Sequence, residues 1–214
     1  EKWVPGPFDF HKLKDILFSW QTGMSDHSAW NAVFWCNHDQ PRVVSRFGDE
    51  GEYWKPSAKM LGTVIHCLRG TPYVYQGEEI GMTNAGFTSL DQYRDVESIN
   101  HFHILRDRGL HEDSAYDILR VHSRDNSRTP MQWDASEGGG FSEAEPWISM
   151  NPNHKTINAA SQVDDPGSIF AHYRKLIALR KQYDVIANGD FAPLDMEHPS
   201  VLAYTRRTDK EETV

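Results

Sequence analysis

The sequence predicts an α/β fold, because segments with helical and strand patterns alternate along it. Apolar residues at helical spacing in 11–20 are followed by a short apolar run at 29–35, and the same order returns at 56–70 and 71–75. Alternation of this kind is typical of a parallel sheet covered by helices. A further amphipathic helix at 168–182 extends the same pattern after a long polar segment.

Local patterns justify the first four elements in turn. The first helix places four apolar residues on one face, namely Leu13, Ile16, Leu17 and Trp20. The nearly continuous apolar run from Ala29 to Trp35 predicts a strand buried on both faces, as in a parallel sheet. Pro56 can open the next helix at its first turn, and Gly70 ends it before a second strand at 71–75.

The segment 76–168 is polar and rich in loops, with helices predicted near 95–106 and 113–121. Segments of this length are usually functional or disordered. The Trp and Phe residues between 102 and 147 argue against disorder, so we expect a functional segment.

The C-terminal part begins with Ser168, which predicts the N-cap of the amphipathic helix. Its apolar face consists of Ile169, Phe170, Tyr173, Leu176, Ile177 and Leu179. Beyond Gly189, residues 201–206 alternate between apolar and polar, which predicts an antiparallel strand.

Composition excludes some classes of protein. The 214 residues carry a formal net charge of −9 and no basic stripe, which argues against nucleic-acid binding. The seven Trp, eight Tyr and ten Phe favour a core, and they also suit a site where flat rings cover sugar faces. No run of 18 apolar residues occurs, so no membrane partner is expected.

Two cysteines, Cys36 and Cys67, lie in apolar runs without CxxC spacing. They predict buried reduced thiols, which fits a cytoplasmic location. The chain opens with EKWVPGPFDF, which has the character of the middle of a loop and not of a natural start. We therefore expect a piece of a longer protein, one that could self-associate through exposed sheet edges when isolated.

Both predicted strands run into polar clusters, AVFWC into NHDQ and TPYVY into QGEE. Because the carboxyl ends of parallel strands meet at one rim of a sheet, we expect these clusters to lie together. The set comprises His38, Asp39, Gln40, Gln76, Glu78 and Glu79. The alternative is that NHDQ before proline is a plain turn, since Asn and Asp favour turns.

Other motifs carry less chemistry. His101 and His103 have no third ligand at metal-binding spacing, so no metal site is predicted. The triple glycine at 138–140 lacks a preceding strand and a following GK[ST], so it is no phosphate cradle. No cofactor is expected.

Four blocks together resemble one family: FWCNHDQPRVVSRFGDE, GTPYVYQGEEIGMTN, YRDVESIN and SRDNSRTPMQW. They resemble the oligo-1,6-glucosidase and trehalose-6-phosphate hydrolase group of glycoside hydrolase family 13, the α-amylase family. That resemblance implies the C-terminal portion of a (β/α)8 TIM barrel, from about helix 6 to helix 8, leading into an antiparallel β domain. It divides the chain into barrel at 1–187, with a long inserted loop at 76–168, and the start of the β domain at 188–214.

The resemblance also implies roles for single residues. Asp39 would be the carboxylate that stabilises the transition state by holding sugar hydroxyls, with His38 beside it. Arg124 would close the pocket around the terminal glucose, and Arg128 is a second candidate for that role. Gln40 would contact the substrate. The family's nucleophile and acid/base would lie upstream of Glu1, so the chain alone would be inactive.

The substrate is a small sugar or sugar phosphate by the same resemblance. Trp35 and Cys36 in FWCNHDQPR look more like trehalose-6-phosphate hydrolases, and Lys2 would then meet the phosphate. A solvated loop lysine is the alternative for Lys2, and a structural ion pair is the alternative for the arginines and Asp39. Two other functions stay open: an oligo-1,6-glucosidase, and a non-catalytic chain like the glucosidase-like heavy chains of amino-acid transporters.

Overall fold

The computed structural model describes residues 2–4, 6 and 8–214, so residues 1, 5 and 7 of the predicted N-terminal loop lie outside it. The chain forms two compact units. The first contains residues 1–5, 35–61 and 74–173, and the second contains 6–34, 62–73 and 174–214. Helices α3 (Trp54–Cys67) and α6 (Ile169–Gln182) each begin in the first unit and end in the second.

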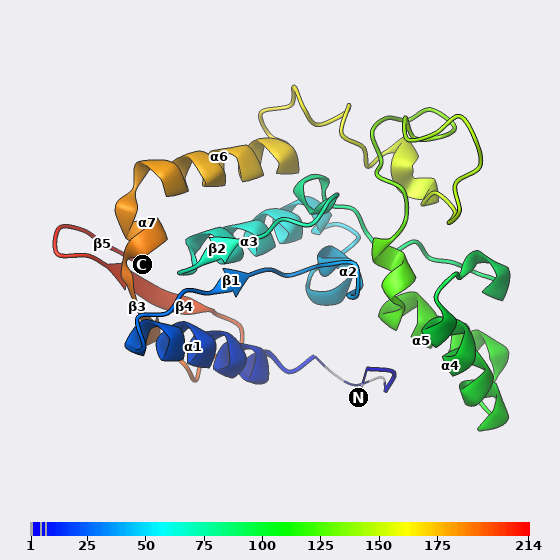
Figure 1. Cartoon of the computed structure of the whole chain (residues 1–214), viewed down its shortest axis with the longest axis horizontal. Helices are drawn as coiled ribbons and strands as arrows, with labels where there is room; N and C mark the ends of the chain where they lie inside the picture. The colour runs from blue at the N-terminus through cyan, green and yellow to red at the C-terminus, as the bar shows by residue number, and fades with distance from the viewer. Residues whose placement is uncertain (1, 5, 7) are drawn as a thin grey trace. The chain divides into compact units, whose positions relative to one another are not determined.

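The second unit holds both sheets of the structure. Strands β1 (Ala32–Val33) and β2 (Thr71–Pro72) pair in parallel, as the sequence predicts. An antiparallel sheet in the order β3-β4-β5 follows. Its strands are Asp190–Leu194, Ala203–Arg207 and Glu212–Thr213, and helix α7 (Asp184–Asn188) precedes them. Helix α1 (Phe10–Asp26) packs against β3, and Phe18, Leu68 and Phe191 form the buried core there (Figure 1).

The parallel strands differ from expectation in length and burial. Each spans two residues, and in the ladder between them the N–H groups of Thr71 and Tyr73 donate to the carbonyls of Asn31 and Val33. Burial on both faces is wrong, since Phe34 is 48% exposed and Tyr73 is 58% exposed. One side of this short sheet therefore faces solvent.

Gly70 places the turn that brings β2 beside β1. Its φ is +133°, and a Cβ there would lie 2.5 Å from the backbone oxygen of Asn31. A side chain would break both the backbone conformation and the approach of the strands. The ladder between β1 and β2 therefore depends on a residue without a Cβ at this position.

The first unit is built around loops and the helix pair α4 (Val96–Asp107) and α5 (Glu112–His122), which lie side by side (Figure 1). The two helices confirm the predictions near 95–106 and 113–121. Their core cluster includes Phe87, Tyr93, Phe102, Leu105, Ile118, Leu119 and Ile148. The short helix α2 (Val43–Phe47) and four 3-10 turns escaped prediction, because single turns carry no periodic pattern.

The four 3-10 turns are η1 (Glu78–Ile80), η2 (Leu90–Gln92), η3 (Arg124–Ser127) and η4 (Pro152–Lys155). At α6, the hydroxyl of Ser168 accepts the N–H of Ala171 at 2.9 Å, which confirms the predicted cap. Strand β4 confirms the strand predicted at 201–206. The proposed division at 187 and 188 stays a prediction.

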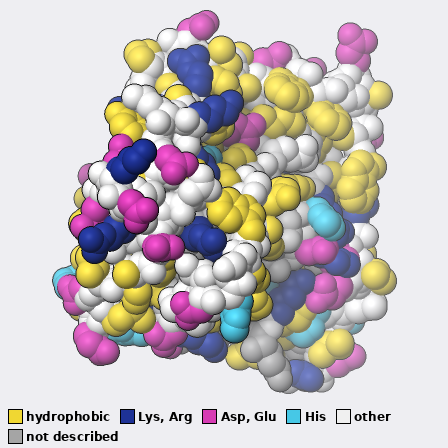
Figure 2. All heavy atoms as spheres, turned by 60° about the vertical axis from the view of Figure 1, so that its left-hand side comes forward, with side chains coloured by type: hydrophobic (Ala, Val, Ile, Leu, Met, Phe, Trp, Pro, Cys, Tyr) yellow, Lys and Arg dark blue, Asp and Glu magenta, His cyan; other side chains and the backbone are white. Residues whose placement is uncertain are grey.

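The surface charges and the two cysteines can be compared with the sequence predictions. On the face seen in Figure 2, acidic and basic side chains are interspersed, without a basic stripe. Both cysteines are free, but only Cys36 is buried and Cys67 is half-buried, so the second burial prediction is wrong. Within the described residues, no helix combines the length and apolarity needed to cross a bilayer.

Lys14 generates a stability test for the second unit. Its side chain is fully buried, and its Nζ donates to the carbonyls of Asp195, His198 and Val201 at 3.2, 2.7 and 3.4 Å. Lys14→Met removes these donors, and we expect it to lower the free energy of unfolding by about 1–3 kcal/mol in urea titrations. Lys12→Met, on the exposed side of α1, is the control and should change it by less than about 0.5 kcal/mol. Equal effects of the two variants would contradict this role.

Candidate active site

The NHDQ segment folds into a tight turn that presents Asp39. The side-chain oxygen of Asn37 accepts the backbone N–H of Asp39 at 2.8 Å, which is a local Asx turn. The turn reading is therefore correct at this place, and the site reading stays a prediction. The Asp39 side chain is 47% exposed, so its carboxylate is open to a ligand.

Two arginines from η3 and the residue after it converge on Asp39. Arg124 Nη1 donates to Asp39 Oδ1 at 2.9 Å, and Arg128 Nη2 donates to the same oxygen at 3.1 Å. The hydrogen bond from Arg124 is the main cause that lowers the pKa of Asp39. Oδ2 lies 3.3 Å from His38 Nε2 and retains acceptor capacity for a hydroxyl.

Arg124 lies between two carboxylates. Besides Asp39, it donates from Nε and Nη2 to both oxygens of Asp95, at 2.9 and 2.8 Å. These bonds raise the pKa of Arg124 above its usual range, and the bonds to Asp95 are the largest cause. Burial is the largest single influence and acts to raise the pKa of Asp95, but the bonds from Arg124, the N–H of Glu97 and the charges of Arg124 and Arg128 together hold that pKa below the usual value.

Lys2 reaches the edge of this cluster through Glu97. Lys2 Nζ lies 2.7 Å from Glu97 Oε2, and the Trp3 indole N–H donates to the other carboxylate oxygen at 3.1 Å. Glu97 in turn lies 3.9 Å from Arg124 Nε. The hydrogen bond from Lys2 is the largest cause that lowers the pKa of Glu97. Lys2 is thus paired in this state, and an anionic ligand would compete with Glu97 for it.

Gln40 and Gln76 act mainly through their backbones. The carbonyl of Gln40 accepts the Ser127 hydroxyl, and its side-chain oxygen accepts Arg46 Nη1 at 2.8 Å. The carbonyl of Gln76 accepts Arg42 Nη1 at 2.6 Å. These bonds join the NHDQ and QGEE segments to η3.

Glu78 lies away from Asp39's open surface. Its side chain is buried, within reach of the Tyr75 N–H at 3.4 Å and the Tyr173 hydroxyl at 3.3 Å. Gly77 makes this turn possible with φ +86°, because a Cβ there would lie 2.2 Å from the sulfur of Met82. The 3-10 turn after Gly77 directs Glu78 inward, so its carboxylate lacks the open surface that Asp39 has, and the shared rim of the two polar clusters stays a prediction.

Asp95, Glu97 and Asp125 are the charged groups of this cluster that sequence reasoning missed. Asp125 is fully buried and accepts the backbone N–H groups of Arg94 and Asp95 at 2.7 and 2.8 Å. The signal available was the repeated Arg-Asp pair in YRDVESIN and SRDNSR, two of the blocks that carry the family resemblance.

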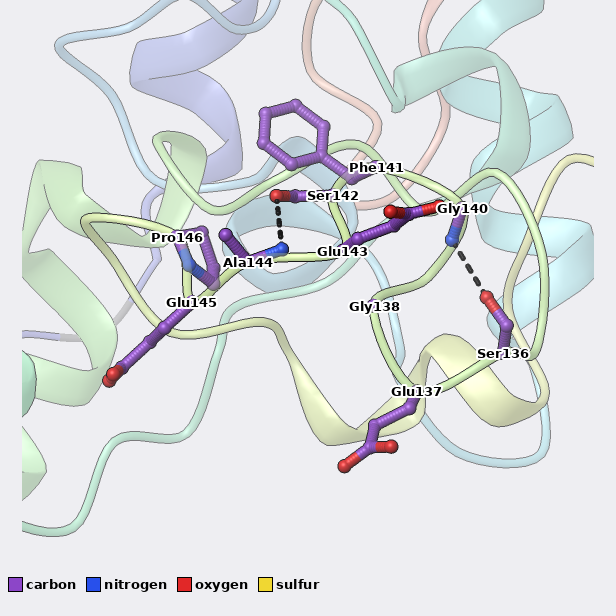
Figure 3. A pocket seen from close by; sticks show the side chains of 10 residues that line it. All are labelled: Ser136, Glu137, Gly138, Gly140, Phe141, Ser142, Glu143, Ala144, Glu145 and Pro146. Carbon is purple, nitrogen blue, oxygen red and sulfur yellow. Dashed lines mark hydrogen bonds between the residues drawn. The ribbon is translucent and has the colours of Figure 1, made fainter.

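A hollow of about 810 Å³ lies in the loop that follows η3. Residues 136–138 and 140–146 line it (Figure 3). Phe141 and three glutamates, Glu137, Glu143 and Glu145, contribute to its wall. The triple glycine builds the bend, where the carbonyl of Gly139 accepts the N–H groups of Trp133 and Asp134. Among the described residues, no group of three or more His, Cys, Asp or Glu side chains is arranged to hold a metal ion.

The fold and this cluster define an α/β protein with an open carboxylate held between arginines. Residues 1–189 match the family model described as the α-amylase catalytic domain. The chain therefore belongs to the α-amylase family, glycoside hydrolase family 13.

Several characterised proteins are similar to it. The trehalose-6-phosphate hydrolase of Bacillus subtilis is 53% identical over 99% of this chain and 38% of the relative. An oligo-1,6-glucosidase of Halalkalibacterium halodurans is 46% identical over 96% of this chain and 36% of its own length. The crystal structure of Bacillus licheniformis trehalose-6-phosphate hydrolase superposes with a TM-score of 0.96 at 53% identity, over 99% of this chain and 38% of that one. This chain thus spans less than two-fifths of the length of these relatives.

Glu78 generates a pH prediction. Burial raises the pKa of Glu78 from 4.5 to about 7. Between these two pH values the folded chain keeps a proton on Glu78 that the unfolded chain releases. The stabilisation is complete below about pH 4.5 and is lost as the pH rises through about 7. The difference between the two pKa values corresponds to about 3 kcal/mol.

In the unaltered chain we expect the free energy of unfolding to fall by about 3 kcal/mol between pH 5 and pH 8. Glu78→Gln should remove most of this fall, as measured by urea titration at each pH. The amide still offers Tyr173 an acceptor, so the packing is retained. Glu50→Gln, at an exposed position, should leave the pH profile unchanged. A profile that keeps its slope in Glu78→Gln would show that Glu78 titrates normally.

Proposed function

We propose that this chain is the C-terminal part of the catalytic barrel of a retaining α-glucosidase that hydrolyses trehalose 6-phosphate to glucose and glucose 6-phosphate. The observation that carries the proposal is Asp39, half-exposed and held ionised by Arg124 and Arg128. The identity of 53% to the Bacillus subtilis trehalose-6-phosphate hydrolase supports the choice of substrate. A cytoplasmic location and self-association of the isolated chain stay predictions.

In this proposal Asp39 stabilises the transition state. Its Oδ2 accepts hydroxyls of the glucose ring, and these bonds strengthen as the ring flattens toward an oxocarbenium ion. Arg124 and Arg128 keep the carboxylate charged and bound the pocket around the terminal glucose, with the His38 imidazole facing Oδ2. The nucleophile and the acid/base, which retaining chemistry places about 5–5.5 Å apart, belong to the preceding part of the protein.

Specificity for the phosphate rests on Lys2 in this proposal. Lys2 is 35% exposed at its side chain and pairs with Glu97, so a phosphate would replace one anionic partner by another. Cys36 is 3% exposed, with its Sγ near the Pro41 carbonyl and the Ser127 hydroxyl, so it contacts no substrate. Its association with phosphorylated substrates is therefore indirect, through the packing beneath the NHDQ turn.

The second candidate is an oligo-1,6-glucosidase, favoured by the 46% identity to the Halalkalibacterium halodurans enzyme. The two candidates differ in the aglycone, and hydrolysis of trehalose 6-phosphate against isomaltose by the full-length protein separates them. A non-catalytic chain is the outcome if the upstream sequence lacks the nucleophile.

The 214-residue chain alone should hydrolyse no glucoside, because the proposal places nucleophile and acid/base outside it. Glucose release from trehalose 6-phosphate, isomaltose and 4-nitrophenyl α-glucoside measures this. The Asp39→Asn chain is the control for contaminating activity. Turnover by the unaltered chain that disappears in Asp39→Asn would contradict the proposal.

In the full-length enzyme, Asp39→Ala should reduce kcat/KM by at least about 10³-fold, or about 4 kcal/mol, since its bonds tighten in the transition state. Thermal unfolding should change far less, because the Asp39 side chain is half-exposed. A loss of activity matched by a loss of folded protein would instead indicate a structural ion pair.

Lys2→Ala should raise KM for trehalose 6-phosphate by about tenfold or more, the size of one lost charge-assisted bond. Trehalose and an aryl glucoside, which lack the phosphate, should be nearly unaffected. Lys12→Ala, an exposed lysine on α1, is the matched control. Equal effects on phosphorylated and unphosphorylated substrates would mean that Lys2 is only a loop lysine.

A further inference from the structure

We infer that Asp95 is a positioning residue, which fixes the guanidinium of Arg124 in the orientation that meets Asp39. The inference rests on the proposed function for its catalytic consequence, and on the geometry of the first unit for its physical basis. Asp95 belongs to none of the sequence segments that end the predicted strands. Its role follows from the contacts it makes.

The two carboxylates hold Arg124 in different ways. Asp95 accepts a two-point fork, with Nε to Oδ2 at 2.9 Å and Nη2 to Oδ1 at 2.8 Å. Asp39 accepts a single bond from Nη1 at 2.9 Å. A planar guanidinium gripped at two points cannot rotate without breaking both bonds, so the fork decides where Nη1 points.

Burial separates the roles of the two carboxylates. The Asp95 side chain is 2% exposed, whereas that of Asp39 is 47% exposed. A carboxylate sealed from solvent cannot bind a sugar hydroxyl, so Asp95 acts on a ligand only through Arg124. Asp39 and Arg124, with 28% of its side chain exposed, remain the groups that a ligand can reach.

Asp95 is itself held from its own helix. It is the N-cap of α4, where Oδ1 accepts the N–H of Glu97 at 3.3 Å and Oδ2 accepts the Ser98 hydroxyl at 3.3 Å. With these bonds the same carboxylate serves both the start of the helix and Arg124. The start of α4 therefore sets the position of the guanidinium.

A second set of bonds links the segment of Arg124 back to the segment of Asp95. Asp125, next to Arg124, accepts the backbone N–H groups of Arg94 and Asp95 at 2.7 and 2.8 Å. The Ser98 and Ser123 hydroxyls add a bond of 2.7 Å between the same two segments. Each Arg-Asp pair thus binds the other, and η3 cannot shift relative to the start of α4 without losing several buried hydrogen bonds.

The first test measures the guanidinium directly in the 214-residue chain. A gripped Arg124 should give a sharp, slowly exchanging Nε–H signal in ¹H–¹⁵N NMR spectra, assigned by its loss in Arg124→Gln. Asp95→Asn keeps an N-cap acceptor but removes the charge, and we expect it to abolish the slow exchange. Asp117→Asn, which breaks only the pair with Arg120, is the control and should leave it unchanged. A protected Nε–H signal in Asp95→Asn would overturn the inference.

The second test is a double-mutant cycle on kcat/KM in the full-length enzyme. Asp95→Asn should lower kcat/KM by about 30-fold or more alone, but by less than about twofold in the Arg124→Gln background, since a residue acting only through Arg124 has nothing left to position. Thermal unfolding of all four proteins tracks the capping role separately. Equal losses in both backgrounds would overturn the inference and leave Asp95 a structural cap.

The two tests separate failure of the inference from failure of the proposed function. Loss of the protected Nε–H in Asp95→Asn supports the positioning role even if the unaltered full-length protein hydrolyses no glucoside. That second result would overturn the α-glucosidase proposal alone. Activity that is insensitive to Asp95→Asn would overturn the positioning role while the proposed function stands.

Discussion

The first unit depends on the hydrogen bonds that the buried guanidinium of Arg42 donates to backbone carbonyls. Arg42 is 1% exposed, and its guanidinium donates to the carbonyls of Gln76, Asn126 and Ser127 at 2.6, 3.2 and 3.2 Å. Two segments distant in sequence, at Gln76 and at 126–127, are thereby bound to one planar group. Burial lowers the pKa of Arg42, and the three carbonyl bonds satisfy donors of its buried guanidinium. Asp39 precedes Arg42 by one short turn, and Arg124 precedes Asn126 by two residues, so the candidate site inherits its geometry from this bond set.

Much of this arrangement could be predicted from the sequence because short-range signals agree with it. The N-cap of α6, the parallel pairing of β1 with β2 and the antiparallel β4 all follow from local patterns. The proximity of Asp39 to Arg124 and Arg128 came from the family resemblance, since 85 residues separate Asp39 from Arg124. No periodicity or spacing could have given that contact.

The rest depends on tertiary packing that local patterns do not encode. Glu78 follows a strand end like Asp39, yet the left-handed Gly77 turns it into the interior, where Tyr173 meets it. Asp95 carries no periodic or strand-end signal in the sequence, and only the fold shows that it both caps α4 and binds Arg124. Phe34 and Tyr73 read as buried strand residues, but a two-stranded sheet leaves one side uncovered.

Cys36 lies beneath the NHDQ turn, with Sγ 3.5 Å from the Ser127 hydroxyl, and burial raises the pKa of its thiol. A thiol in this position is doubly shielded from electrophiles, since it is covered and mostly protonated. Alkylation of Cys36 therefore requires the structure that covers its thiol to open, and the rate of alkylation reports that opening. The half-buried Cys67 supplies an internal reference for the same reagent in the same chain. The alkylation rate of Cys36 relative to that of Cys67 thus reports opening around the NHDQ turn from within the chain itself.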